Sequence, residues 1–287
     1  MIDKFRQWLT EEGKAPKTIE SYINDVSQYQ NYLDEKSGQH VLLSRFSFVQ
    51  YKQYLLDKEL AIATINKKIN SLKVYNNFLQ FSKVVDDSYI SLKKDRVAIA
   101  SGSEHQVEVL TEDQIDKLLF HLEQPSVCLR NRLIAYLLLY TGVRVSELVN
   151  IKQKDIDGLT QTLTVRGKGG KVREISLRQD VMQLIQKYKT GERAKSNFKD
   201  SDYLLLSQRA AKLHRDTVRN WLELTSEGVG VKLYPHLFRH TFCTRLLKKG
   251  VDLTTVSKLA GHSTVNMTAK FYIQTTREEK IAAVELL

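Results

Sequence analysis

Apolar residues recur at helical spacing through the first ninety residues of the chain. Thr18 and Ser47 are each placed to cap a helix, because both stand at the start of runs in which apolar residues return every three or four positions. The pattern predicts four helices in this part. The buried residues expected in the fourth, ATINKKINSLKVYNNFLQF, are Ile65, Ile69, Leu72 and Leu79.

The opposite side of that fourth helix carries polar side chains that can contact phosphates and base edges. On this helix alone a merely solvated face is the favoured interpretation. Residues 91–108 then lose the periodicity and bring in Ser, Gly and charge, which is typical of a linker. We expect domains at 1–93 and 108–287, with the linker at 94–107. The polar residues of the fourth helix are Lys67, Asn70, Lys73 and Asn77.

The pattern changes after Val109. Thr111 and Gln114 have capping-box spacing, and the nearly all-apolar segment LRNRLIAYLLLYTG ends at Gly142. The stretch LTVRGKGGKVREISL has two alternating runs around a Gly-rich turn, which predicts a β-hairpin. The expected fold class is mainly α in two domains, the second with a small antiparallel sheet. Further helices are expected at 179–189, 214–225, 235–249 and 253–260, and from about Thr276.

Composition favours a polyanionic partner. The chain of 287 residues carries 44 Lys+Arg against 33 Asp+Glu, a net charge of +11. Cys128 and Cys243 have no CxxC partner, so neither a disulfide framework nor a zinc site is expected. The acidic N-terminus does not resemble a signal peptide, and the longest apolar stretch, around 133–140, is too short to span a bilayer. We therefore expect a cytoplasmic protein with no membrane partner.

Two short segments carry candidate chemistry in the first half of the second domain. Arg144 follows the apolar helix, and Glu147 could orient it, although an isolated arginine there is usually a surface residue. Lys168 lies at the tip of the predicted hairpin, the usual setting of a solvated loop or a nonspecific phosphate contact. The hairpin also crowds three cations against a single Glu174. They are Arg166, Lys171 and Arg173.

Two more segments follow near the C-terminus. In PHLFRH, His236 and Arg239 share the first turn of a helix, where a histidine is more often structural than catalytic. His262 follows a glycine, and Tyr272 comes ten residues later, although a tyrosine is more often a core residue than a nucleophile.

Together the four segments make a set of reagents for attack on a phosphodiester without a metal. Two guanidiniums can bind the nonbridging oxygens, on which negative charge gathers, and histidines add donors. Tyrosine must lose a proton of pKa about 10, so nearby cations and a base are needed to make it a nucleophile. A flexible lysine can protonate the departing 5′ oxygen.

The combined motifs TGVRVSEL, KQKDID, GKGGKVR, HLFRH and LAGH, with a tyrosine near the C-terminus, closely resemble the tyrosine recombinase (phage integrase) family, nearest its Xer-like members. The resemblance covers the whole chain. It implies that Arg144 and Arg239 hold the scissile phosphate and that Glu147 supports Arg144.

The same resemblance implies that His236 and His262 are the phosphate-side histidines. Lys168 would be the general acid, and Tyr272 the nucleophile that becomes joined to the 3′ phosphate. Family members commonly place the tyrosine nine residues after the second histidine, where this chain has Phe271. Tyr272 is therefore expected to reach the phosphate only if the segment STVNMTAK absorbs one residue in a loop or bulge.

The resemblance further implies that a helical core-binding domain and a catalytic domain clamp duplex DNA. A homotetramer on two sites, with a dimer on each, would exchange strands through a Holliday junction with no ATP, metal or other cofactor. Whether accessory proteins take part does not follow from the sequence. Because no further domain precedes the core-binding helices, we expect chromosome, plasmid or transposon resolution rather than an integrase with separate arm sites.

Two other classes of function stay open from the sequence. A type IB topoisomerase would use a similar set of residues, working as a monomer without site preference. A noncatalytic DNA-binding regulator would keep the basic helices but would have no use for Lys168 and Tyr272.

Overall fold

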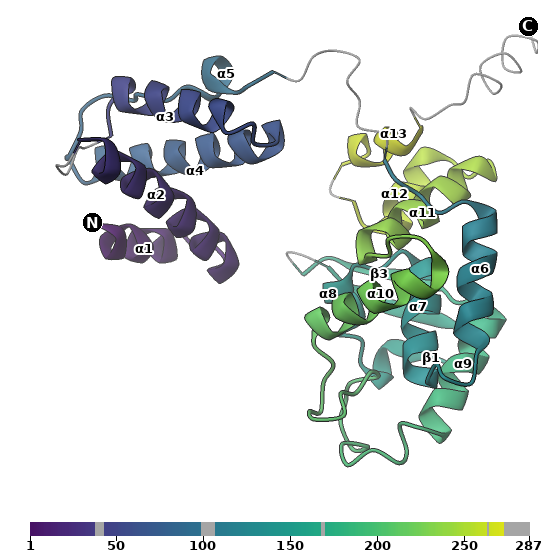
Figure 1. Ribbon diagram of the computed structural model, residues 1–287. Coiled ribbons are helices and arrows are strands. Elements are labelled where there is room, and N and C mark those ends of the chain that lie inside the picture. The colour runs from purple at the N-terminus through teal and green to yellow at the C-terminus, as the bar shows by residue number, and fades with distance from the viewer. Residues whose placement is uncertain (38–42, 99–106, 168–169, 263, 273–287) are drawn as a thin grey trace, which may run out of the picture. The chain divides into compact units, whose positions relative to one another are not determined.

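The computed structural model describes residues 1–37, 43–98, 107–167, 170–262 and 264–272. It divides into two compact units, Met1–Glu104 and His105–Leu287, each with a hydrophobic core of its own (Figure 1). Among these residues, no helix is long and apolar enough to cross a membrane.

The first unit is helical throughout its described residues. The four predicted helices are present as α1 (Ile2–Glu11), α2 (Pro16–Ser37), α3 (Arg45–Asp57) and α4 (Ile62–Phe81). A further short helix, α5 (Leu92–Asp95), follows them. Large aromatic side chains pack among the Leu, Ile and Val residues of the core and bury much apolar surface for so small a helical unit. They include Phe5, Tyr29, Tyr32, Phe48, Tyr51, Tyr75 and Phe78.

Helix α4 buries the predicted apolar face, whereas two predicted caps are displaced. Ser44, not Ser47, is the N-cap of α3, and Ser47 completes the capping box from the third helical position. Helix α2 begins at Pro16, before Thr18, because proline is preorganised for the first helical position. The apolar residues of α4 are buried as predicted: Ile65, Ile69, Leu72 and Leu79.

The second unit is built around helix α7 (Leu129–Thr141), which is buried on nearly all sides as its apolar sequence predicts. Helices α9 (Gln179–Thr190) and α11 (Pro235–Lys248) pack against it. The Thr111–Gln114 capping box opens α6 (Glu112–Glu123) as predicted. Helix α10 (Arg215–Val229) completes the longer elements.

The predicted hairpin is present as strands β2 (Thr162–Arg166) and β3 (Val172–Ser176), with Val165 opposite Arg173. A two-residue strand β1 (Ile156–Asp157) extends it to a three-stranded antiparallel sheet in the order β1-β2-β3. Leu163, Val165 and Ile175 join the core on one face of this sheet. The mainly helical fold with a small antiparallel sheet is therefore confirmed.

Short helices complete the unit. They are α8 (Val145–Leu148), the 3-10 turn η1 (Gln153–Asp155), α12 (Leu253–Ala260) and α13 (Asn266–Tyr272). Helix α13 was not predicted, and it contacts α11 and α12. The helix expected from about Thr276 lies outside the described residues.

Candidate active site

Arg144 stands at a sharp turn between two helices. Helix α7 ends at Gly142, which has the left-handed φ of 59° that the predicted stop requires. Two residues later Arg144 is the N-cap of α8, and the Glu147 carboxylate accepts its backbone N–H at 2.8 Å. The same carboxylate accepts a second bond, from Nη1 of Arg144, at 2.9 Å. Glu147 thus fixes both the backbone and the guanidinium of Arg144.

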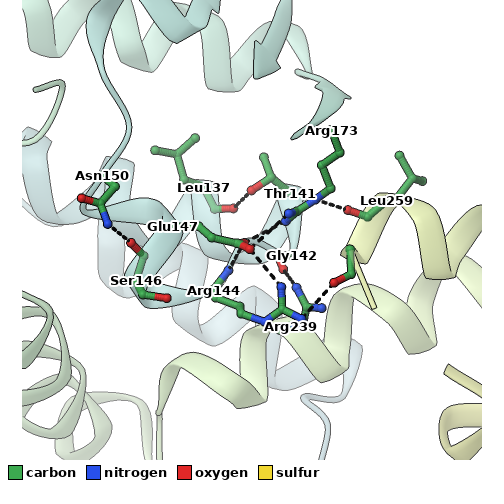
Figure 2. A network of polar contacts seen from close by, with 11 residues as sticks. Leu137, Thr141, Gly142, Arg144, Ser146, Glu147, Asn150, Arg173, Arg239 and Leu259 are labelled. Carbon is green, nitrogen blue, oxygen red and sulfur yellow. Dashed lines mark hydrogen bonds and ion pairs between the residues drawn. The ribbon is translucent and has the colours of Figure 1, made fainter. Parts of the chain in front are cut away.

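Glu147 also accepts hydrogen bonds from a residue of the sheet. Arg173 of β3 donates Nη1 and Nη2 to its two oxygens, at 3.1 and 2.8 Å (Figure 2). Burial raises the pKa of Glu147, but the bonds from Arg173 and from the backbone N–H of Arg144 outweigh it, so the net shift is downward. Glu147 therefore stays ionised between the two arginines.

Arg239 lies beside Arg144 and is almost fully enclosed. Arg239 is only 3% exposed, and its Nη1 donates to the carbonyl of Gly142 at 2.7 Å. Nη2 is buried and meets no acceptor among the described residues. Burial, and after it the charge of Arg144, lowers the pKa of Arg239, but a guanidinium stays charged at neutral pH. A buried cationic N–H without an acceptor is costly, and it is the arrangement that an anion would complete.

The C-terminus of α12 receives two of these guanidiniums. Arg144 donates Nη2 to the carbonyl of Gly261 at 2.9 Å, and Arg173 donates Nε to the carbonyl of Leu259 at 2.8 Å (Figure 2). Carbonyls at a helix C-terminus carry partial negative charge and attract cations. Both contacts hold the end of α12, and His262 follows directly after it.

The histidines around the arginines are all biased toward the neutral form. Burial lowers the pKa of His236, with smaller contributions from Arg239 and Arg144. Burial lowers the pKa of His262 to about 4, and the same two arginines add to the effect. The pKa of His240 is lowered too, by burial and then by His236. Neutral imidazoles can donate one hydrogen bond each without adding charge to the site.

The two remaining predicted site residues are described only in part or not at all. Tyr272 is the last residue of α13, and its side chain lies outside the description. Lys168 lies outside the described residues, between Gly167 and Gly170 of the hairpin. The structure thus brings together Arg144, Glu147, Arg239, His236 and His262.

The predicted DNA contacts of the hairpin divide into two groups. Arg166 and Lys171 are exposed. Arg173 is turned inward, with a side chain 12% exposed, and each of its guanidinium nitrogens donates to a protein oxygen. The alternation of the strand explains the difference, because Arg173 lies opposite Val165, a residue of the buried face. The guanidinium of Arg173 is therefore directed into the site, where it binds Glu147.

The predicted contacts of α4 lie in the first unit. Lys67 and Asn77 are exposed, and Asn70 and Lys73 are half-buried. The Nζ of Lys67 donates to both oxygens of the buried Asp25, at 2.8 and 3.0 Å. The charge of Lys67 is therefore partly balanced within the unit.

Two residues that the sequence analysis did not single out share a pocket with Arg144. Arg215 and Arg219 of α10 line a pocket of about 120 Å³ together with Arg144 and His236. Their i, i+4 spacing on a predicted helix was the signal available, but the sequence does not show which way that face points. Asp216 partly balances Arg215 and Arg219, at 3.7 and 2.8 Å, but the arginines of this region still outnumber its carboxylates, which makes it suited to an anion.

Comparison with known proteins identifies the chain. Residues 108–279 match the model of the phage integrase family, and residues 1–89 match the N-terminal SAM-like domain of phage integrases. The chain belongs to the phage integrase family. It is 30% identical to a protein named tyrosine recombinase XerC of Pediococcus pentosaceus over 97% of this chain and 94% of that protein. It is also 32% identical to the TnP I resolvase of Bacillus thuringiensis, over 92% of each.

Solved structures agree on the fold of this phage integrase family member. The structure of the XerH site-specific recombinase bound to a palindromic difH substrate has a TM-score of 0.79 at 21% identity, over 94% of this chain and 80% of that one. A Tn1549 transposon integrase has a TM-score of 0.74 at 20% identity, over 100% and 99%. The chain is a site-specific tyrosine recombinase, and neither alternative class of function is favoured.

Proposed function

We propose that this site cleaves a DNA strand by forming a 3′-phosphotyrosyl bond. The observation that carries the proposal is Arg239, a buried guanidinium whose Nη2 meets no acceptor among the described residues. A nonbridging oxygen of the scissile phosphate supplies the missing acceptor. Arg144, half-exposed beside it and held by Glu147, binds the same phosphate. The two positive charges stabilise the charge that gathers on phosphorus during attack.

The remaining steps follow from the residue types. The Tyr272 oxygen attacks phosphorus, the bond from phosphorus to the 5′ oxygen breaks, and Lys168 gives that oxygen its proton. Neutral His236 and His262 donate hydrogen bonds to the phosphate. The phosphotyrosyl bond keeps the energy of the broken phosphodiester, so the strand is rejoined by the reverse attack.

Tyr234, the N-cap of α11, is the tyrosine nearest in sequence to His236 and Arg239, and its contacts argue against it as the nucleophile. Its hydroxyl donates to the Glu108 carboxylate at 2.8 Å. Burial, and then that bond, raises the pKa of Tyr234 to about 12. A tyrosine that acts as a nucleophile must lose its proton, so its pKa needs to be lowered rather than raised. We therefore assign the attack to Tyr272.

At larger scale we propose that residues 1–93 form the core-binding domain and residues 108–287 the catalytic domain on double-stranded DNA. The Tn1549 transposon integrase structure is a complex with a circular intermediate DNA, and the XerH structure is a complex with its difH substrate, which supports this partner. We assign a tetramer on two sites, working in the cytoplasm with no cofactor. The similarity to the TnP I resolvase supports a role in resolution.

Single-turnover cleavage tests the proposal. The site is first located by footprinting on DNA from the genetic neighbourhood, and a nicked duplex carrying it then traps the covalent product. Arg239→Lys keeps the charge but loses the paired donors, so cleavage should slow by about 100-fold or more while site binding changes little.

The matched control is Arg209→Lys, a change at an exposed arginine outside the site. It should cleave at the wild-type rate. Wild-type cleavage by Arg239→Lys would remove Arg239 from the phosphate site and overturn the proposal.

A further inference from the structure

A buried threonine on helix α13 contacts the second phosphate-side histidine. The Oγ1 of Thr268 lies 2.6 Å from Nδ1 of His262, and Thr268 is 0% exposed. The backbone N–H of His262 donates to Ser257 at 3.0 Å, so the end of α12 holds the histidine from the other side. Thr268 therefore connects α13 to His262.

The chemistry of imidazole gives this contact a direction. His262 is neutral at neutral pH, because burial and the neighbouring arginines disfavour its charged form. A neutral imidazole has one N–H and one bare nitrogen, and the partner of one nitrogen decides which atom carries the proton. If Nδ1 accepts from the threonine hydroxyl, Nε2 carries the proton and can donate to a phosphate oxygen. The reverse tautomer would present a lone pair to an anion.

The position of Thr268 in its helix adds a second consequence. Positions 268 and 272 are four residues apart in α13, so they fall on the same face, about 6 Å apart along the axis. Position 271 is turned by about 100° from position 272. Because Thr268 is held at His262, the face that includes position 272 is the one turned toward that histidine. In the helix Asn266–Tyr272, position 272 therefore falls on the same face as Thr268.

We propose that Thr268 is a positioning residue whose hydroxyl donates to Nδ1 of His262, fixing both the tautomer of the histidine and the face of α13 on which the nucleophile stands. The inference rests on the proposed functions of His262 and Tyr272. It assigns to Thr268 no contact with DNA.

The test uses full-length protein and single-turnover cleavage of the nicked site. Thr268→Val keeps the branched shape and removes the hydroxyl, and it should cleave about tenfold more slowly with unchanged site affinity, the size expected for one buried hydrogen bond. Thr268→Ser restores the hydroxyl and should recover most of the rate. Thr264→Val, at an exposed position just before α13, is the matched control and should cleave normally.

A double-mutant cycle separates positioning from a general effect on folding. If Thr268 acts through His262, Thr268→Val should have no further effect on the rate in a His262→Ala background. Nitrogen-15 spectra of the histidine ring should show the proton on Nε2 in the wild type and a changed tautomer balance in Thr268→Val. The His262→Ala protein identifies the signal.

Each outcome decides a different claim. A slow His262→Ala with a fully active Thr268→Val would overturn the role of Thr268, as would an equal slowing by Thr268→Val in both backgrounds. A fully active His262→Ala would instead overturn the proposed function of His262, and with it the reason for fixing a tautomer.

Discussion

Glu147 binds the guanidiniums of Arg144 and Arg173 through a buried carboxylate, with a side chain only 5% exposed. Replacing it by Gln keeps the shape but leaves Arg144 and Arg173 without a counter-charge. Breaking a buried pair of this kind costs about 3 kcal/mol in the free energy of unfolding. Urea unfolding of Glu147→Gln at pH 7 measures the loss. Glu174→Gln, at an exposed carboxylate beside Arg173, should change stability by less than about 0.5 kcal/mol.

The cost of that substitution should depend on pH in a known direction. The pKa of Glu147 is lower in the folded chain than the ordinary 4.5, so the unfolded chain takes up the proton first as the pH falls. The stabilisation is complete above pH 4.5 and is lost below it, as the pH approaches the folded-state pKa. The stability difference between wild type and Glu147→Gln should therefore shrink between pH 5 and the acid limit. A difference that grew on acidification would contradict the ion-pair account.

Gly142 combines a left-handed backbone with a close neighbour. A Cβ there would lie 2.3 Å from Cδ1 of Phe242, and φ is 59°. Gly142→Ala should lower the free energy of unfolding by about 3 kcal/mol, through left-handed strain and overpacking together. Gly230, the C-cap of α10 with φ 72°, has nothing within 4 Å of such a Cβ. Gly230→Ala should cost only about 1 kcal/mol, and equal losses in thermal unfolding would exclude a role for Phe242.

At the scale of elements, Arg173 joins strand β3 to helices α8 and α12 through Glu147 and Leu259. A lysine at this position cannot make the three hydrogen bonds that Arg173 donates to Glu147 and Leu259. We expect Arg173→Lys to slow single-turnover cleavage by about 10- to 100-fold, because Arg144, Arg239 and the hairpin would no longer be correctly placed to bind the phosphate. Site affinity should fall little. Loss of affinity with an unchanged cleavage rate would contradict this role and support the predicted DNA contact of Arg173.

Arg166→Lys is the matched control for that experiment. Arg166 is the exposed arginine on the paired strand, and its charge is kept in the variant. It should cleave at close to the wild-type rate.

The elements that the sequence predicted well are those determined by residues close together in the chain. The capping box at Thr111, the helix stop at Gly142 and the Gly-rich hairpin each depend on residues within a few positions of one another. The resemblance to the family supplied the arginines and histidines that the structure brings together. Contacts between segments far apart in the chain could not be predicted from the sequence. Arg144 meets the Gly261 carbonyl 117 residues away, and no periodicity reports such a pairing.

Helix α13 and the inward turn of Arg173 were missed for the same physical reason. Seven residues give too few turns for a clear helical pattern, so α13 depends on packing against α11 and α12. A charged residue in a strand is ordinarily assigned to the exposed face. Arg173 occupies an inner position because a buried carboxylate from another element balances its charge.

On the scale of the whole molecule, the two units have separate hydrophobic cores. Each core consists of residues from one unit, so each should unfold cooperatively by itself. Residues 1–98 and 107–287, produced separately, should each show a sigmoidal urea transition close to one seen in the full chain. A noncooperative transition in either fragment would mean that its core depends on the other unit.

The central claim is that Tyr272 attacks DNA held by the buried arginine pair. The most direct measurement is peptide mapping of the protein trapped on the nicked site. The nucleotide should be found on a fragment containing Tyr272, Tyr272→Phe should bind the site without forming an adduct, and Tyr234→Phe should still form one. An adduct on Tyr234, or one that persists in Tyr272→Phe, would contradict the account.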